Sequence, residues 1–577
     1  MAKNKVNKVN KVAAKKGGTP SDSAKGWREA IESIVIAIVL AFLFRAFEAE
    51  AFVIPTGSMA PTLQGRHKDV KCPDCNYRYR AGASIDTEVR DGPVVATTCP
   101  MCFFTKELEP GTASDYSHTG DRILVNKFAY EKPFGDPKRW DVIVFKFPGN
   151  AKQNYIKRLV GLPDETIKIR HGDIFVQTDE EESFSIARKS PEKLKHMLQL
   201  VHDTKYLSPQ LRELGWPLRW QPMSSTTGWS TDDGGHSYHC QSKGEEDWIR
   251  YRHYPISFDQ WSRLLERYES GQRDLGNIRP EPTLITDFYA YNSQTRPLPS
   301  YRGYGNRGFE HPADIGLHWV GDLAMVVDVD VLSDQGQIVL DLVEAGRHHE
   351  CRIDLETGVA TVSMADGKAT FDGGNREAKS QTRVKGKGSY RIRFSNVDDE
   401  LRLWVDDRLC EFDAATTFPV NPDDRPVTSD EDPGDLAPVG FAVKDAEVKV
   451  NDFQILRDIY YIATRMSFGS TTDYQTDRHR DIIEELKDPK EWLRSDNLFD
   501  RRNEVIFKME ADQFFPLGDN SPYSRDGRLW ENKHYVDRDL LIGKAILIYW
   551  PHAWRVSLPF LETVPILPNF QRMGLIH

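Results

Sequence analysis

Ser58 is a candidate nucleophile because of the turn that surrounds it. It follows an apolar segment and lies among Pro55, Gly57 and Pro61. Glycine permits backbone conformations that a side chain forbids, and proline stiffens the chain on either side. The pattern suits a serine displayed at a fixed place, although most serines in such turns are plain turn residues. A nucleophilic role therefore requires a base and an oxyanion donor elsewhere in the chain.

Lys157 is the candidate base. It lies beside Arg158 in an apolar stretch over residues 155–160. Neighbouring side chains of a strand point to opposite faces, so one of these two cations must face inward or lie in a cleft. Burial lowers the pKa of a lysine, and the neutral amine can take a proton from a serine hydroxyl. A solvated strand lysine is the alternative for this segment alone.

Four of the seven cysteines form two CxxC pairs, with 23 residues between the pairs: Cys72, Cys75, Cys99 and Cys102. Four thiolates on two tight turns match a tetrahedral structural zinc site and leave no position open for a catalytic water. We predict a zinc ribbon inserted over residues 66–118. Two disulfides or four free thiols are the alternatives, because thiols outside the cytoplasm tend to oxidise.

Length and composition limit the possible classes. A chain of 577 residues is expected to form more than one domain, and 39% hydrophobic residues suffice for packed cores. The net charge of −11 argues against a general nucleic-acid binder. Seven cysteines are too few for a scaffold built on disulfides.

The basic N-terminus predicts a membrane topology. Residues 1–26 are lysine-rich and nearly free of apolar side chains, so we expect a disordered cytoplasmic tail. The uncharged run over 33–44 is short of the ~20 residues that span a bilayer, whereas 27–47 is long enough if its terminal charges reach the interface. We predict a single-pass transmembrane helix over 27–47 that leaves the following chain outside the cytoplasmic membrane. A cleavable signal peptide and a buried helix of a soluble protein are the alternatives.

Strand patterns surround the two candidate catalytic residues. Turn-bounded, β-rich stretches occur at 120–127, 140–148, 155–169, 505–508 and 541–550. We predict a mainly β protein whose antiparallel catalytic domain combines residues 48–65, 119–176 and 505–552.

The rest of the chain reads as insertions and a tail. Residues 177–316 form a mixed insertion of unclear fold, with helical texture over 192–215 and 258–269. Residues 317–456 have short alternating strands, similar to concanavalin/laminin-G-like jelly rolls, and predict an inserted β-sandwich. Residues 457–504 predict a linker with a helix at 478–486, and the proline-punctuated tail over 553–577 is expected to pack on the surface.

Three segments, in this order, resemble the sequence boxes of bacterial type I signal peptidases. They are Pro55-Thr56-Gly57-Ser58-Met59, Tyr155-Ile156-Lys157-Arg158, and Gly518-Asp519-Asn520 running to Ser524-Arg525-Asp526-Gly527-Arg528. The apolar segment before the serine fits this family as well.

The resemblance implies roles for individual residues. Ser58 corresponds to the nucleophile and Lys157 to the general base of a Ser–Lys dyad. Thr56 corresponds to a hydroxyl that joins the Ser58 amide in an oxyanion hole, and Ser524 to a serine that orients the lysine. The resemblance gives three residues supporting roles: Asp519, Asp526 and Arg528. Gly527 stands where the family commonly has a serine, between two matched charges.

Together with the apolar anchor, the resemblance implies a membrane-anchored endopeptidase that cuts exported preproteins after small residues. We expect no cofactor for catalysis and a structural zinc in the ribbon. The partners of this endopeptidase would be preproteins, membrane lipid and a carbohydrate or protein ligand of the sandwich, but no nucleic acid. Another Ser–Lys processing protease, or a non-catalytic membrane receptor on a decayed peptidase scaffold, is the alternative.

Overall fold

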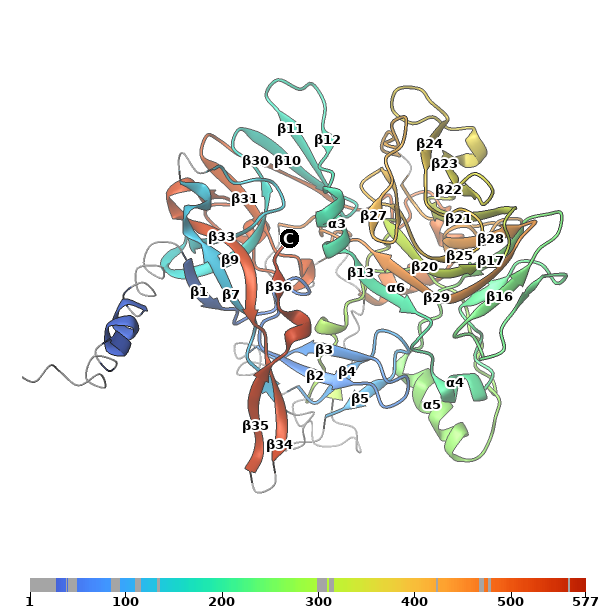
Figure 1. Cartoon of the computed structure of the whole chain (residues 1–577), viewed down its shortest axis with the longest axis horizontal. Coiled ribbons are helices and arrows are strands. Elements are labelled where there is room, and N and C mark those ends of the chain that lie inside the picture. The colour runs from blue at the N-terminus through green and yellow to red at the C-terminus, as the bar shows by residue number, and fades with distance from the viewer. Residues whose placement is uncertain are drawn as a thin grey trace, which may run out of the picture.

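The computed structural model describes residues 27, 29–37, 39, 49–84, 94–108, 116–131, 135–297, 309–310, 316–421, 424–465, 472–475, 479–558 and 561–577. These residues form mainly antiparallel β-sheets, which confirms the predicted fold class at that level. Figure 1 shows two bodies side by side, with the short strands of a third, smaller unit below and between them.

The first body, the catalytic lobe, is built on one sheet in the order β1-β7-β33-β8-β9-β31-β32, with β36 paired to β33. Its apolar strand residues pack into two clusters around Ile143, Val144 and Phe145. The sheet joins chain segments from both ends of the sequence: β1 (Ala49–Val53), β7 (Arg122–Asn126), β8 (Val142–Phe147), β9 (Asn150–Gly161), β31 (Gln513–Leu517), β32 (Val536–Asp537), β33 (Leu541–Trp550) and β36 (Gly574–Leu575).

A four-stranded sheet extends this lobe, in the order β12-β11-β10-β30. Its core residues Ile167, Ile169 and Phe507 pack with Phe515 of β31. The strands are β10 (Glu165–Arg170), β11 (Asp173–Thr178), β12 (Ser185–Ile186) and β30 (Glu504–Lys508).

The small unit carries the cysteines on its hairpin turns. One CxxC turn joins β2 to β3 and the other joins β4 to β5. Its strands are β2 (His67–Lys71), β3 (Arg78–Gly82), β4 (Ala96–Thr98), β5 (Thr105–Glu107) and β6 (Ser117–His118).

The second body is a β-sandwich. Both of its sheets contribute to one core, with Met325 and Val327 from one sheet and Leu340 and Ile353 from the other. One sheet contains β13 (Gln199–Asp203), β15 (Trp229–Ser230), β16 (Tyr238–Gln241), β20 (Leu323–Val331), β25 (Gly388–Asn396), β26 (Leu401–Val405), β27 (Arg408–Leu409) and β29 (Glu447–Arg457). The other contains β14 (Trp220–Pro222), β17 (Asp247–Tyr251), β21 (Gln337–Glu344), β22 (Arg347–Asp354), β23 (Val359–Met364), β24 (Glu377–Gln381) and β28 (Val439–Lys444).

The sandwich therefore takes up strands from the region whose fold the sequence left open. β13 to β17 lie before residue 252 in the chain, yet they pair with β28 and β29 near its far end.

The helices agree with the sequence in part. The predicted helix at 258–269 is α5 (Phe258–Glu269), with a capping box between Ser257 and Gln260. The helix expected at 478–486 is α6 (His479–Lys487), followed by α7 (Pro489–Trp492). The prediction of helical structure over 192–215 was wrong in the middle of this range, where strand β13 lies between α3 (Pro191–Met197) and α4 (Pro209–Glu213). β13 forms because its backbone pairs with β29, a contact distant in sequence that local periodicity cannot report.

The C-terminal residues form the hairpin β34 (Ala553–Leu558) and β35 (Leu561–Pro568), seen as the long red arm in Figure 1. After the hairpin, β36 returns to the catalytic sheet and Arg572 pairs with Asp121 at 2.5 Å.

Among the helices that the structure describes, none combines the length and the apolar character needed to cross a membrane. The predicted anchor over 27–47 is described only at 27, 29–37 and 39, and the predicted tail over 1–26 lies outside the described residues.

Candidate active site

Ser58 and Lys157 meet at the end of the catalytic sheet. Ser58 lies in the turn after β1, and Lys157 lies on β9, 99 positions along the chain. The Nζ atom of Lys157 is 2.7 Å from the Oγ atom of Ser58. That is hydrogen-bond distance, and it is the contact that proton transfer from a serine to an amine requires.

The environment of Lys157 favours a neutral amine. Only 4% of this residue is exposed. Burial lowers its pKa from 10.5 to about 8, although the charges of Asp526 and Asp519 raise the pKa and partly offset the effect of burial; Arg528 lowers it again. A substantial fraction of the Lys157 side chain is therefore deprotonated near neutral to mildly alkaline pH.

Both adjacent cations of β9 are buried, whereas the sequence required only one to be. The side chain of Arg158 is fully buried and forms two parallel hydrogen bonds of 2.7 Å to the carboxylate of Asp519. Thr62 donates a third hydrogen bond to this carboxylate at 2.5 Å. Arg158 thus ties β9 to the segment after β31 and to the chain just past Ser58.

The 518–528 segment forms a second buried ion pair. Arg528 contacts both carboxylate oxygens of Asp526 at 2.9 Å, and both side chains are fully buried. The backbone N–H groups of Gly518 and Arg528 also donate to this carboxylate, at 3.0 and 3.2 Å. This pair fixes the loop that faces Lys157.

Neighbouring atoms leave no space for a side chain at Gly527. A Cβ atom at this position would lie 2.6 Å from the His534 carbonyl oxygen and 2.9 Å from the Phe515 ring. A serine at this position would not fit without movement of the backbone.

The two remaining predicted residues, Ser524 and Thr56, lie in the same region, but their hydroxyls donate no hydrogen bond to another described residue. The buried Ser524 hydroxyl has no hydrogen-bond partner among the described residues, so the expected bond to Lys157 is not formed. In the same part of the structure, neither the half-buried Thr56 hydroxyl nor the Ser58 backbone N–H donates a hydrogen bond. Both groups therefore remain available to an oxyanion.

Asn520 holds the nucleophile turn, a role that the sequence did not predict. Its backbone N–H donates to the Ser58 carbonyl at 3.1 Å, and its side-chain amide donates to the Gly57 carbonyl at 3.0 Å. The signal was its place directly after Asp519 in the third sequence box.

The long insertion also reaches this turn, through η2 (Ala290–Asn292). The side-chain amides of Asn292 and Asn520 exchange two hydrogen bonds of 2.7 and 2.8 Å. Tyr291 packs against Gly57 so closely that a Cβ atom there would lie 2.1 Å from its ring. Gly57 is therefore required for space, because its φ lies outside the left-handed region that favours glycine.

The sandwich supports this contact from behind. Arg457, at the end of β29, donates to the backbone carbonyls of Asp287 and Phe288 at 3.0 and 3.1 Å. Nothing in the composition of residues 287–292 marks them as part of a site, because their role depends wholly on where the sandwich places them.

The four cysteines form a buried cluster that can hold a structural metal. One sulfur atom from each residue lies within 4.8 Å of all the others, and Cys72–Cys102 and Cys75–Cys99 are both 3.5 Å apart. Those distances far exceed a disulfide bond of about 2.05 Å. Tetrahedral zinc with Zn–S bonds of about 2.3 Å separates its ligand atoms by about 3.8 Å, so the donor set and spacing fit zinc.

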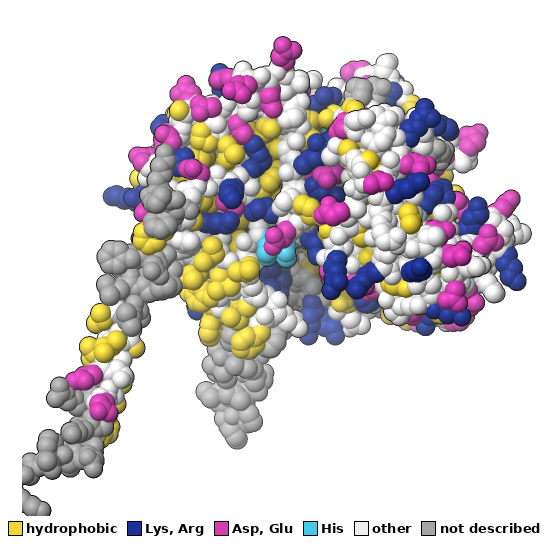
Figure 2. Space-filling model, turned by 45° about the horizontal axis from the view of Figure 1, so that its top comes forward, with side chains coloured by type: hydrophobic (Ala, Val, Ile, Leu, Met, Phe, Trp, Pro, Cys, Tyr) yellow, Lys and Arg dark blue, Asp and Glu magenta, His cyan; other side chains and the backbone are white. Residues whose placement is uncertain are grey.

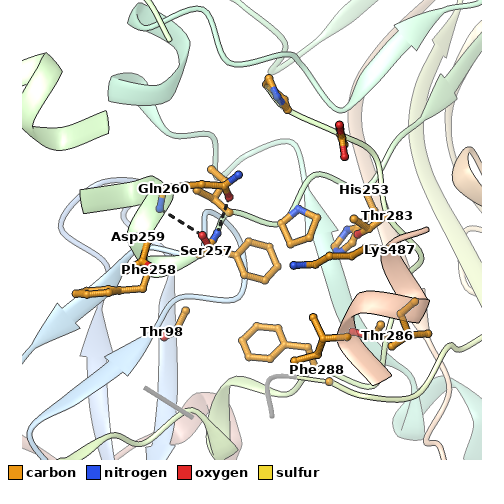
Figure 3. Close-up of a pocket in the computed structure, with 18 of the residues that line it drawn as sticks. Thr98, His253, Ser257, Phe258, Asp259, Gln260, Thr283, Thr286, Phe288 and Lys487 are labelled. Atoms are coloured by element: carbon orange, nitrogen blue, oxygen red, sulfur yellow. Dashed lines mark hydrogen bonds between the residues drawn. The ribbon is translucent and has the colours of Figure 1, made fainter. Parts of the chain in front are cut away.

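A separate cavity of about 700 Å³ lies between the cysteine hairpins, α5 and α6. Figure 3 shows Ser257 and Gln260 on one side of it and Phe288, Thr283 and Lys487 across from them. Neither Ser58 nor Lys157 lines this cavity, so the candidate active site is elsewhere on the molecule.

Sequence comparison finds relatives for part of the chain. A family described as "Signal peptidase, peptidase S26" matches residues 93–212. Signal peptidase I of Pseudomonas aeruginosa is 43% identical over 72 residues, which cover 11% of this chain and 25% of that protein. "Probable signal peptidase I-2" of Synechocystis is 24% identical over 175 residues, 30% of this chain and 53% of that protein. The chain thus spans a quarter to about half of these relatives.

Among solved structures, carbohydrate-binding module CBM66 from Bacillus subtilis aligns with 42% of this chain and 93% of its own, at 10% identity and a TM-score of 0.20. Galectin LEC-6 from Caenorhabditis elegans aligns with 24% of this chain and 83% of its own, at 8% identity and a TM-score of 0.17.

Proposed function

We propose that the protein is a type I signal peptidase, a serine endopeptidase that removes signal peptides from exported preproteins after small residues. The match of residues 93–212 to the family described as "Signal peptidase, peptidase S26" supports this proposal. The observation that carries the proposal is the 2.7 Å contact between Lys157 Nζ and Ser58 Oγ in a buried site. A Ser–Lys pair of this geometry needs no histidine.

In the proposed mechanism, neutral Lys157 accepts the Ser58 proton as the serine oxygen attacks the scissile carbonyl. The Ser58 N–H and the Thr56 hydroxyl face the developing oxyanion, a contribution typically worth about 3 kcal/mol for each donor. Protonated Lys157 gives its proton to the leaving amine, and the freed amine then activates the water that hydrolyses the acyl-enzyme. The ion pairs of Asp519 with Arg158 and of Asp526 with Arg528 keep the segments around the lysine in position. A role of Ser524 in orienting the lysine stays a prediction of the sequence, because its hydroxyl forms no bond to Lys157 in this structure.

The free edge of strand β1 could bind an extended substrate. Among the described residues β1 pairs only with β7, so its other edge is open just before the nucleophile turn. We propose that the preprotein adds there as a strand, which would present its cleavage site to Ser58.

We place the protein in the cytoplasmic membrane, with its N-terminus inside and the catalytic lobe on the outer face. Apolar side chains near the start and the end of the described catalytic sheet support this: Val53, Phe570 and Leu575 are 54%, 57% and 68% exposed. Figure 2 shows hydrophobic side chains gathered on the lobe nearest the N-terminal helix. Such a patch is typical of a surface that contacts a membrane or a partner.

The cysteine cluster is proposed to hold a structural zinc. Cys99→Ser should remove the metal and loosen the hairpins, because three thiolates bind zinc far more weakly than four. Elemental analysis of purified protein should give one zinc for each wild-type chain and a large loss in the variant. Cys410→Ser, outside the cluster, is the control and should keep its zinc. Wild-type protein without zinc would contradict the assignment.

Preprotein cleavage as a function of pH tests the proposed activity. With wild-type protein and a preprotein bearing an Ala-x-Ala site, kcat/KM should rise about tenfold for each pH unit up to about pH 8, because Lys157 must lose its proton to act as the base. Above about pH 9 the rate should level off. Mass spectrometry of the products should show one cut after the small residue.

The alternatives make different predictions in the same assay. A non-catalytic receptor on a peptidase scaffold would leave the preprotein intact at every pH. Another Ser–Lys processing protease would cut other substrates and spare the signal-peptide site. A carbohydrate or protein ligand of the sandwich stays a prediction of the sequence.

A further inference from the structure

A small acidic cavity lies where the catalytic lobe meets the sandwich. It has a volume of about 20 Å³ and is lined by Asp173, Asp322, Glu344 and Asp458, among others. Asp173 begins β11 of the catalytic lobe, whereas Asp322 precedes β20 and Asp458 follows β29 of the sandwich. Carboxylates from both bodies therefore converge on a space that is large enough for one water-sized sphere.

The carboxylates are close enough together to bind one and the same ion. One oxygen atom from each of Asp173, Asp322 and Asp398 lies within 4.8 Å of the other two. Ligand atoms around an ion with bonds of 2.3–2.6 Å are at most about 4.6–5.2 Å apart, whereas bonds of 2.0–2.1 Å allow only about 4.2 Å. Separations within 4.8 Å can therefore be bridged by an ion of the size of Ca²⁺.

The nearby cations do not balance this charge. Lys189 contacts Asp398 and Asp458, each at 2.7 Å. His171 and Arg502 also line the cavity, but they pair with Asp424. Neither Asp173 nor Asp322 forms an ion pair with any described residue, which leaves an excess of negative charge.

One buried oxygen in this cavity lacks any partner. Asp458 is 2% exposed, and its Oδ1 atom has no hydrogen bond within the described part of the chain. Its other oxygen is already bound to Lys189. Burial and the neighbouring carboxylates raise the pKa of Asp173 and Asp322, as expected when like charges crowd together, and they raise the pKa of Asp458 even though Lys189 lowers it.

We propose that one Ca²⁺ ion binds here, held by the clustered carboxylates of Asp173, Asp322 and Asp398, with the partnerless Oδ1 atom of Asp458 lining the same cavity. The ligands are all oxygen atoms, which hard divalent cations prefer, and they come from separate segments of the chain: Asp173 begins strand β11, and Asp322 and Asp398 lie outside strands. The ion would cross-link the sandwich to the β10–β11 hairpin.

The site also has a short route to the candidate active site. Four residues beyond Asp458, the backbone of Ile462 accepts a hydrogen bond from Arg528 and donates one to Ser521, both at 2.9 Å. An ion that fixes Asp458 would steady the segment that holds Arg528 beside Asp526. The binding itself does not depend on the proposed peptidase function, so the two can fail separately.

Terbium luminescence tests the site directly. Trp319 and Tyr460 line the same cavity and can sensitise a bound Tb³⁺ ion. In metal-depleted buffer, full-length protein should show Tb³⁺ emission on excitation of its aromatic residues, and added Ca²⁺ should quench it. Asp322→Asn should lose this emission. Asp334→Asn, which changes an exposed side chain of the same sandwich, should keep it.

Thermal unfolding gives a second measurement, because it separates a variant that has lost only the ion from one that is misfolded. Ca²⁺ should raise the Tm of the wild type and of Asp334→Asn, but not that of Asp322→Asn. Without Ca²⁺, Asp322→Asn should be at least as stable as the wild type, because the substitution removes one charge from a crowded cluster. Wild-type protein that shows neither Ca²⁺-displaceable Tb³⁺ emission nor a Ca²⁺-dependent Tm overturns the proposal, as does an Asp322→Asn variant that responds like the wild type.

Discussion

Replacing Lys157 with alanine is expected to reduce preprotein cleavage by about 10⁴-fold or more, without loss of expression. The amine lies 2.7 Å from the Ser58 hydroxyl, and no other amine or imidazole contacts that hydroxyl among the described residues. Without the base, the hydroxyl keeps its proton at any pH that the fold tolerates. The rate should be measured with purified protein and a preprotein that carries an Ala-x-Ala site.

Three further variants are needed to interpret this result. Lys146→Ala removes an exposed lysine from the neighbouring strand β8 and should cleave at the wild-type rate. Ser58→Ala should be as inactive as Lys157→Ala, and the double variant no worse, because the two residues act as one unit. Normal turnover by Lys157→Ala would refute the dyad.

Replacing Arg158 with alanine should produce the largest loss of stability. The substitution leaves the fully buried carboxylate of Asp519 without its two hydrogen bonds from Arg158. Breaking a buried ion pair in this way costs about 3–5 kcal/mol. Hydrogen exchange of peptides from β9 and β31 should report this loss as faster opening, because it measures the stability of these strands separately from the sandwich.

The matched control is a surface pair. Arg383 contacts Asp406 at 3.1 Å, but 49% and 36% of these side chains are exposed. Arg383→Ala should therefore change stability by no more than about 1 kcal/mol. A double variant, Arg158→Met with Asp519→Asn, should recover part of the loss because it leaves no buried charge unpaired. Equal effects of Arg158→Ala and Arg383→Ala would show that the buried pair contributes little.

The sequence predicted those parts of the site that depend on residues close together in the chain. The strand pattern around Lys157 reflects burial on a sheet, and it corresponds to β9. The CxxC turns correspond to two hairpin turns because a tight turn is encoded within a few residues. The same holds for α5, whose capping box can be read directly from Ser257 and Gln260.

Contacts between distant segments could not be predicted in this way. Tyr291 and Asn292 reach the nucleophile turn only because Arg457 of the sandwich holds the preceding carbonyls. Strand β13 was mistaken for part of a helix because its partner β29 lies about 250 positions further along the chain. A single sequence shows neither of these pairings.

The distance between the contacting segments has a consequence for the order in which the protein is made. Asn520 and the Gly57 carbonyl, joined by a hydrogen bond, are 463 positions apart. A ribosome therefore delivers Ser58 and Lys157 long before the segment that holds them in place, and every strand of the sandwich emerges in between. The sandwich can fold as a unit while the catalytic sheet is still open. Whatever activity the site has begins only after residue 528 has emerged, so a partly synthesised chain carries Ser58 in an incomplete setting.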